Sequence, residues 1–309
     1  MIAATEPNHW SSLAPHLSLA SSLFGERGEG LVRDWLAEHM ARIDDPAFAK
    51  LFTDHIDLPG IEPADYKHRL VRTERGSLLG GIRFYGQDTT RPFVEVVAHD
   101  FGDWNALADA VASEWHPFAP LHLRTLGVHG HPLPPGAHVD MSIHLARYGD
   151  MAPPDGRVTL ASFGDVEDAV AMVARRYEEL GGDDPALARN ISAADPDDLR
   201  AWHRDGRLVA IHALVDGHRT VVGLFAAAPG SVEWIAGDEV NEEVIAKRYN
   251  GRGFAASAQA AWAARDRVDA DRLLVGTIDR LNVASRRTAE RAGRPPVLDY
   301  VFVSLTEPR

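Results

Sequence analysis

The chain has 309 residues, of which 45% are hydrophobic and 25% charged, a composition typical of a folded globular protein rather than a disordered or collagenous one. Its formal net charge of −13 argues against a nucleic-acid partner, and the lack of cysteine excludes disulfides, thiolate metal sites and a cysteine nucleophile. There is no run of 18 apolar residues and no signal-peptide pattern, so we expect a cytoplasmic protein with no membrane contact. Fifteen histidines are present without a zinc-binding motif, and no metal is expected.

Apolar periodicity in the first half of the chain predicts mixed helices and strands. An amphipathic helix covers 31–43, and a hairpin follows, with strands 68–73 and 78–85 on either side of Arg75-Gly76. The remaining elements of this half are a strand at 93–98, a helix at 104–115, and strands at 121–128 and 139–147.

The segment Tyr148–Gly156 (YGDMAPPDG) predicts a domain boundary. Two adjacent prolines interrupt helices and central strands, and the flanking glycines favour turns. We therefore expect an N-terminal domain over 1–148 and a C-terminal domain over 149–309.

The second half repeats much of the order of the first. Its predicted elements are a strand at 158–161, helices at 166–180 and 196–203, a hairpin of 208–214 and 220–227 around Asp216-Gly217, a strand ending near 244–246, a helix at 254–265, a strand at 273–277, a helix at 283–292 and a strand at 297–305. Both halves contain the series hairpin, strand, turn, helix and strand. This recurrence favours an internal duplication.

A glycine loop joins the strand ending near 244–246 to the helix at 254–265. It reads Arg248-Tyr249-Asn250-Gly251-Arg252-Gly253, and glycine at both places allows backbone N–H groups to turn toward a ligand. These amides and the positive end of the following helix can bind phosphate oxygens. The simpler alternative is a strand-to-helix turn with two solvated arginines.

Arg-x-x-Gly-x-Gly at this place resembles the acyl-CoA pyrophosphate loop of the GNAT acetyltransferase superfamily. The segment Asn282-Val283-Ala284-Ser285, followed by Ala292-Gly293, is similar to the family's last helix. The resemblance covers about half of the chain and implies an α/β fold with a mixed, mainly antiparallel sheet flanked by helices. The repeated element order extends this to two tandem domains, the first of them a degenerate copy whose His99–Asp103 turn carries two aspartates.

The resemblance implies acetyl-CoA or another acyl-CoA as co-substrate. The loop would hold the pyrophosphate, and the strand before it would splay from its parallel neighbour to pair with the pantetheine arm. The residues expected to contact the cofactor are Val244, Ile245, Ala246, Arg248, Tyr249, Asn250, Gly251, Arg252, Gly253, Phe254, Asn282 and Ser285.

An amine acceptor must lose a proton before it attacks the thioester, so a base is needed. The resemblance points to Glu239 or Glu242 on the strand before the loop. Strand alternation places Glu242 and Glu243 on opposite faces. The tyrosine that the family uses to protonate the thiolate is replaced by Ala289, and neither Tyr249 nor Tyr300 occupies its position.

Two functions remain open from the sequence. The first is N-acyltransferase, most simply N-acetyltransferase, activity that transfers the acyl group directly to an amine. The acceptor is expected to be a small molecule, although a protein lysine is an alternative. The second is a non-catalytic acyl-CoA-binding or sensing protein, which the loss of the tyrosine favours. A homodimer is compatible with either.

Overall fold

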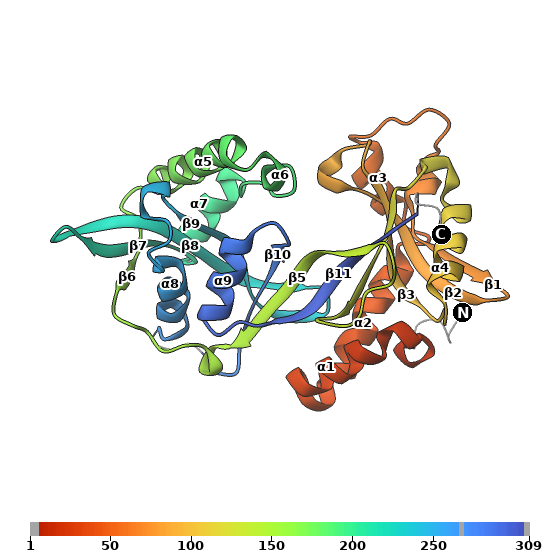
Figure 1. Cartoon of the computed structure of the whole chain (residues 1–309), viewed down its shortest axis with the longest axis horizontal. Helices are drawn as coiled ribbons and strands as arrows, with labels where there is room; N and C mark the ends of the chain where they lie inside the picture. Colours follow the sequence, from red (N-terminus) through yellow and green to blue (C-terminus); the bar gives the residue numbers. More distant parts are fainter. Residues whose placement is uncertain (1–5, 266–268, 306–309) are drawn as a thin grey trace. The chain divides into compact units, whose positions relative to one another are not determined.

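The computed structural model describes residues 6–265 and 269–305, and the chain divides into two compact units (Figure 1). Unit 1 comprises Met1–Met141 and Leu298–Arg309, and unit 2 comprises Ser142–Val297. The chain enters unit 2 within strand β5 (Ala137–Arg147) and returns to unit 1 within strand β11 (Pro296–Ser304). This division differs from the boundary predicted at Tyr148–Gly156, and it assigns most of the last strand to unit 1.

Two tertiary features account for the difference. The proline-rich segment is no solvated linker, because Tyr148 and Met151 in it are buried and the amide of Tyr148 donates to the carbonyl of Arg272. The last strand pairs antiparallel with β4 (His122–Val128) from Leu298 to Ser304. Prolines show where regular structure stops, but they do not show which unit a strand will join.

Within unit 1 the strand order is β1-β2-β3-β4-β11, with a parallel β3–β4 pair among antiparallel ones. Its other elements are α1 (Ala14–Phe24), α2 (Gly28–Ala41), α3 (Pro46–Thr53), β1 (Arg69–Thr73), β2 (Gly76–Phe84), β3 (Pro92–His99) and α4 (Trp104–Glu114). The main core joins Leu107 and Trp115, in and just after α4, to Ile82 and Val94 of the sheet. The helices α1 and α3 were not predicted, and α2 begins at Gly28 rather than at residue 31.

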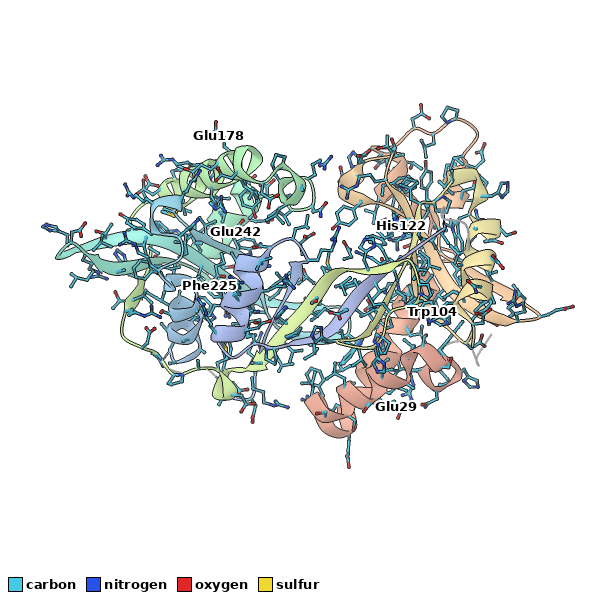
Figure 2. The ribbon with its side chains drawn as sticks, viewed as in Figure 1. Glu29, Trp104, His122, Glu178, Phe225 and Glu242 are labelled. Atoms are coloured by element: carbon cyan, nitrogen blue, oxygen red, sulfur yellow. The ribbon has the colours of Figure 1, made fainter. Side chains whose placement is uncertain are left out.

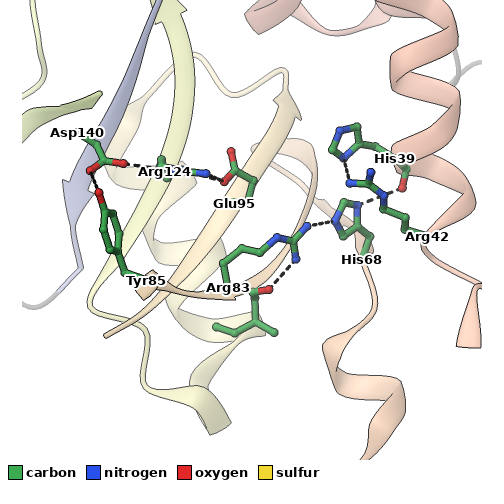
Figure 3. Close-up of polar contacts among 9 residues, drawn as sticks. His39, Arg42, His68, Arg83, Tyr85, Glu95, Arg124 and Asp140 are labelled. Carbon is green, nitrogen blue, oxygen red and sulfur yellow. Dashed lines mark hydrogen bonds and ion pairs between the residues drawn. The ribbon is translucent and has the colours of Figure 1, made fainter. Parts of the chain in front are cut away.

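Polar side chains form two clusters in unit 1 (Figure 3). Arg124 bonds Glu95 and Asp140, and Asp140 also accepts a hydrogen bond from the Tyr85 hydroxyl at 2.9 Å. The guanidinium of Arg124 lies 4.6 Å from the ring of Tyr300, which makes that tyrosine part of the cluster. The second cluster joins the stacked rings of His39 and His68 to the guanidinium groups of Arg42 and Arg83.

Within unit 2 the strand order is β5-β10-β9-β8-β7-β6. Its elements are β6 (Val158–Ala161), α5 (Val166–Asp183), α6 (Pro185–Ala188), α7 (Pro196–Arg204), β7 (Leu208–Val215), β8 (His218–Val232), β9 (Ile235–Ile245), α8 (Phe254–Ala263), β10 (Leu273–Asp279) and α9 (Val283–Arg291). One core joins α5 and α7 to Leu224 and Val244, and another joins α8 to Phe225 and Leu274. Helices therefore cover both faces of the sheet (Figure 1). The predicted mixed, mainly antiparallel sheet flanked by helices is confirmed.

Candidate functional site

A β-bulge on β9 determines which acidic side chains share a face of the sheet. The pairing of β9 with β8 shifts by one residue at Asn241, whose side-chain oxygen accepts a hydrogen bond from the amide of Ala228 at 3.1 Å. On β8, Ala226 and Ala228 are two residues apart and thus lie on one face; they pair with Glu242 and Glu239, respectively. The two predicted bases, three residues apart, are therefore brought to the same face.

The parallel strands β9 and β10 separate after a short paired stretch. The pairs that join them within the described residues are Leu274 with Asp238 and Val275 with Glu239. Beyond these pairs, β9 continues to Ile245 and β10 continues to Asp279. The edge of β9 that faces β10 is consequently open, which is the splay that the GNAT resemblance implies.

A cavity of about 450 Å³, here called the cleft cavity, lies at this opening. The predicted site residues that line it are Glu242, Val244, Ile245, Tyr249, Asn250, Gly251, Gly253, Phe254, Asn282 and Ser285. Four predicted residues, Glu239, Ala246, Arg248 and Arg252, are not among its lining residues. The structure thus brings the strand, the glycine loop and the start of α9 together, but it separates Arg248 and Arg252 from this group.

Glu242 is 6% exposed and accepts three hydrogen bonds. Its Oε2 accepts from the amide of Ala194 at 3.1 Å, and its Oε1 accepts from the amide of Glu243 at 3.1 Å and from the Tyr177 hydroxyl at 3.4 Å. Burial raises the pKa of Glu242 because an ionised carboxylate is poorly solvated there, although the three donors oppose the shift. Figure 2 shows Glu242 between the sheet and α5, whereas Glu178 points outward from that helix. A carboxylate with a raised pKa is suited to accepting a proton near neutral pH.

The neighbouring glutamates have other environments. Glu243 faces α8, where the amide group of Gln259 donates to both of its carboxylate oxygens at 3.0 Å, and Gln259 in turn accepts from Arg294 at 2.9 Å. Burial raises the pKa of Glu243 and also that of Glu239. Of the two predicted bases, Glu242 alone lines the cleft cavity.

The glycine loop leaves a row of backbone donors without protein acceptors. Gly251 and Gly253 have φ angles of +76° and +79°, which non-glycine residues rarely adopt. Helix α8 begins at Phe254 with no side-chain cap, and the amide of Ser257 donates to the carbonyl of Gly253 at 3.2 Å. Among the described residues, the amides from Gly251 to Ala256 have no acceptor. Unpaired amides at a helix N-terminus are groups of the kind that can bind an anion.

A second cavity of about 390 Å³, the loop cavity, lies on the α8 side of this loop. Arg157 donates to the carbonyl of Arg252 at 3.0 Å and is paired with Asp155, which also accepts from the Ser257 hydroxyl at 2.7 Å. Burial acts to raise the pKa of Asp155, but the hydrogen bonds from Arg157 and Ser257 outweigh it and lower the pKa to about 2. Arg291 lines both the loop cavity and the cleft cavity.

Asp155 and Arg157 were not among the predicted site residues: Asp155 fell in the predicted boundary Tyr148–Gly156, and Arg157 directly follows it. An acidic and a basic residue two positions apart carried no periodic signal. Only their contacts with a loop about 100 residues away identify them as part of the site.

Asn282 caps α9, since its side-chain oxygen accepts from the amide of Ser285 at 3.1 Å. Ala289, at the place of the family's tyrosine, is fully buried and offers no proton donor. Among the residues that line the cleft cavity is also Tyr177 of α5, whose pKa is raised by burial and, second, by the charge of Glu242. Tyr177 was not predicted, because its position in the helix at 166–180 suits a core residue equally well.

The corresponding region of unit 1 is filled by protein groups. At the end of β3 the amide of His99 donates to the Ser12 hydroxyl at 2.8 Å, and on β4 the carbonyl of Leu126 accepts from the His16 ring at 3.1 Å. The first amides of α4 are capped by the carboxylate of Asp103, at 3.2 Å. Unit 1 therefore offers no free helix N-terminus after β3, and unit 2 contains the candidate site.

Residues 6–265 and 269–305 contain no group of three or more His, Asp or Glu side chains that could hold a metal ion. No helix in these ranges is long and apolar enough to cross a bilayer.

No protein-family model matches the chain, and no curated protein matches it. Solved structures do match over most of its length. One is a GCN5-related N-acetyltransferase from Sphaerobacter thermophilus, with 14% identity over 87% of this chain and 96% of that chain and a TM-score of 0.43. A GNAT-family acetyltransferase from Colwellia psychrerythraea has 9% identity over 86% and 96%, with a TM-score of 0.45. A tandem GNAT protein from the clavulanic acid biosynthesis pathway has 14% identity over 86% and 98%, with a TM-score of 0.37. These solved structures bear the name of the superfamily that the glycine loop resembles.

Proposed function

We propose that unit 2 is an acyl-CoA-dependent N-acyltransferase, most simply an N-acetyltransferase, that acts on a small-molecule amine. The observation that carries the proposal is the row of unpaired amides from Gly251 to Ala256, at the junction of the cleft and loop cavities. Both cavities are lined by Gly251, Gly253 and Arg291, so they meet at this loop. A ligand with an anionic centre and two long arms fits that arrangement.

The residues present suit each part of an acyl-CoA. The pyrophosphate would be held by the loop amides and the N-terminus of α8. The open edge of β9 at Val244 and Ile245 would pair with the pantetheine amides, whereas the amide and carbonyl of the predicted Ala246 are already bonded to Val222 and Tyr249. The loop cavity, with Arg157, Arg252 and Arg291 around it, would accept the nucleotide end. Asn282 and Ser285 would contact the arm near the thioester.

The bound acyl-CoA supplies a thioester carbonyl, and the reaction forms a C–N bond as the C–S bond breaks. We assign the proton transfers to a coupled pair in the cleft cavity. A proton that an ammonium acceptor loses before attack passes to solvent. Glu242 takes the proton that the amine nitrogen loses as the C–N bond forms, and the Tyr177 hydroxyl gives its proton to the departing sulfur. The 3.4 Å contact between Tyr177 and Glu242 lets the protonated carboxyl return a proton to the phenolate. No proton is gained or lost by the pair over the cycle.

The test is release of free thiol from acetyl-CoA in the presence of a panel of small amines, together with CoA binding by calorimetry. Turnover with at least one amine supports the transferase. CoA binding without turnover on any amine or lysine peptide supports the sensing alternative instead, which the buried Ala289 favours.

Gly251→Trp tests the loop assignment. A Cβ at Gly251 meets no atom within 4 Å, so the added ring extends into the open space where the cavities meet. CoA binding should be lost. Gly217→Trp is the matched control, because Gly217 has a φ of +81° and equally open surroundings but lies in the β7–β8 turn. Undiminished CoA binding by Gly251→Trp would refute the assignment of the loop.

A further inference from the structure

A third cavity in unit 2, of about 480 Å³, lies on the α5 side of the sheet and is here called the α5 cavity. One wall is a single face of α5, since Asp168, Ala171, Arg175 and Glu179 are spaced three or four residues apart. The other walls are the loop after β6, strands β7 and β8, and the residues that follow β9. It shares one lining residue, Arg176, with the cleft cavity and none with the loop cavity.

The interior of the α5 cavity is apolar. Phe163 and Ala210 belong to the core beneath α5, and Met172 and Val221 pack against that core. Ala246 adds a methyl group at the end of β9. A hydrocarbon or aromatic body placed here would lose contact with water on several sides, which favours binding.

The rim of the α5 cavity carries an excess of positive charge in an acidic protein. Arg175, Arg176, Lys247 and Arg248 line it, against the carboxylates of Asp168 and Glu179. The Lys247 ammonium is engaged with Asp183 at 2.7 Å, whereas none of the described ion pairs involves the three arginines. Arginine clusters of this kind suit carboxylate or phosphate groups.

Two residues that line the α5 cavity each carry a buried polar atom that lacks a hydrogen-bond partner within the described residues. These atoms are Nδ1 of His212 on β7 and Nη1 of Arg176 on α5. Leaving a buried donor or acceptor unpaired is costly, so such atoms in a folded protein call for an explanation. A polar group bound in the cavity would satisfy both.

We infer that the α5 cavity is a ligand site, separate from the acyl-CoA site, for an amphipathic anion: a carboxylate or phosphate head with an aliphatic or aromatic body. The head group binds among Arg175, Arg176 and Arg248 and the ring of His212, and the body lies on Phe163 and Met172. Arg248, which the sequence assigned to the pyrophosphate, belongs to this site. The inference does not depend on catalysis by unit 2.

The test is calorimetric titration of the full chain with octanoate, octyl phosphate and octylamine. Saturable binding of either anion at one site per chain, with no comparable binding of octylamine, is expected, and the two anions distinguish a carboxylate ligand from a phosphate one. Equal binding of octylamine, or no saturable binding of either anion, overturns the inference.

Two alanines on exposed helix surfaces provide matched blocking variants. Ala171 lines only the α5 cavity and Ala284 only the cleft cavity. Ala171→Trp should weaken anion binding at least about tenfold, and Ala284→Trp should leave it unchanged. The reverse pattern would place the anion in the cleft cavity and refute the inference.

A variant that removes one positive charge tests the same site if Ala171→Trp fails to fold. Arg175→Gln should weaken anion binding by about tenfold, since a charged hydrogen-bond partner is removed. The exposed Arg204→Gln on α7 carries the same change in net charge away from the cavity and should have no effect. Equal effects of the two variants would show a general charge effect and overturn the inference.

Discussion

Two buried histidines in unit 1 should make its stability fall steeply below neutral pH. His68 is 1% exposed and His39 is 8% exposed, and their rings stack at 5.3 Å. Arg42 donates to the His39 ring at 3.1 Å, and Arg83 donates to the His68 ring at 2.6 Å, so both rings act as neutral acceptors (Figure 3). Burial, and then the positive charges of Arg42 and Arg83, lower the pKa of His39 to about 3. Burial, and then mainly the charge of Arg83, lower the pKa of His68 to about 2.

The sign and size of the effect follow from proton linkage. Between pH 6.5, the ordinary histidine pKa, and the lowered folded values, the unfolded chain binds protons that the folded chain does not. The stability that depends on the two neutral histidines is therefore retained above pH 6.5 and is lost as the pH falls below it. Each histidine lowers the free energy of unfolding by about 1.4 kcal/mol at pH 5.5 and by less than about 0.1 kcal/mol at pH 7.5. These values hold for any pKa in the folded state that lies well below 5.5.

The assay is urea unfolding of wild type and His68→Phe at pH 7.5 and pH 5.5, followed by tryptophan fluorescence. The variant is expected to be less stable at both pH values, but its loss of unfolding free energy between them should be about 1.4 kcal/mol smaller than that of wild type. The exposed His218→Gln in unit 2 should keep the wild-type difference. An equal pH dependence in wild type and His68→Phe would show that His68 is not held neutral in the folded state.

Two further predictions concern the cleft cavity. Glu242→Gln should lower kcat by about 10²–10⁴-fold because the base is lost. The variant should also lack the part of the wild-type pH–rate profile in which activity rises with pH. In wild type this rise should occur above the ordinary glutamate pKa, since burial raises the pKa of Glu242. Glu239→Gln, on the same face but outside the cavity, should change kcat only a few-fold, and a larger loss in Glu239→Gln than in Glu242→Gln would reverse the assignment of the base. Tyr177→Phe should lower kcat by about 10²-fold with little change in the KM for acetyl-CoA, measured by thiol release. A rise in KM at unchanged kcat would instead mean that Tyr177 only packs against the ligand.

The sequence by itself determined the local features of this protein. The Asp216-Gly217 turn lies between β7 and β8 as predicted, because both residues adopt the positive φ angles that such a turn requires. The glycine loop likewise preceded a helix predicted to begin at residue 254, and α8 does begin at Phe254. These are properties of a few neighbouring residues, so they can be read from the order of residues.

Only the tertiary structure decided what depends on contacts between distant residues. The bulge at Asn241 places Glu239 and Glu242 on one face of the sheet. The cleft cavity lies where β9 separates from β10, and of these two glutamates it is lined by Glu242. Tyr177 meets Glu242 across 65 residues of sequence, and the last strand joins unit 1 by pairing with β4. Register and strand partnership follow from the packing of the whole sheet, which the amino-acid pattern of a single strand does not specify.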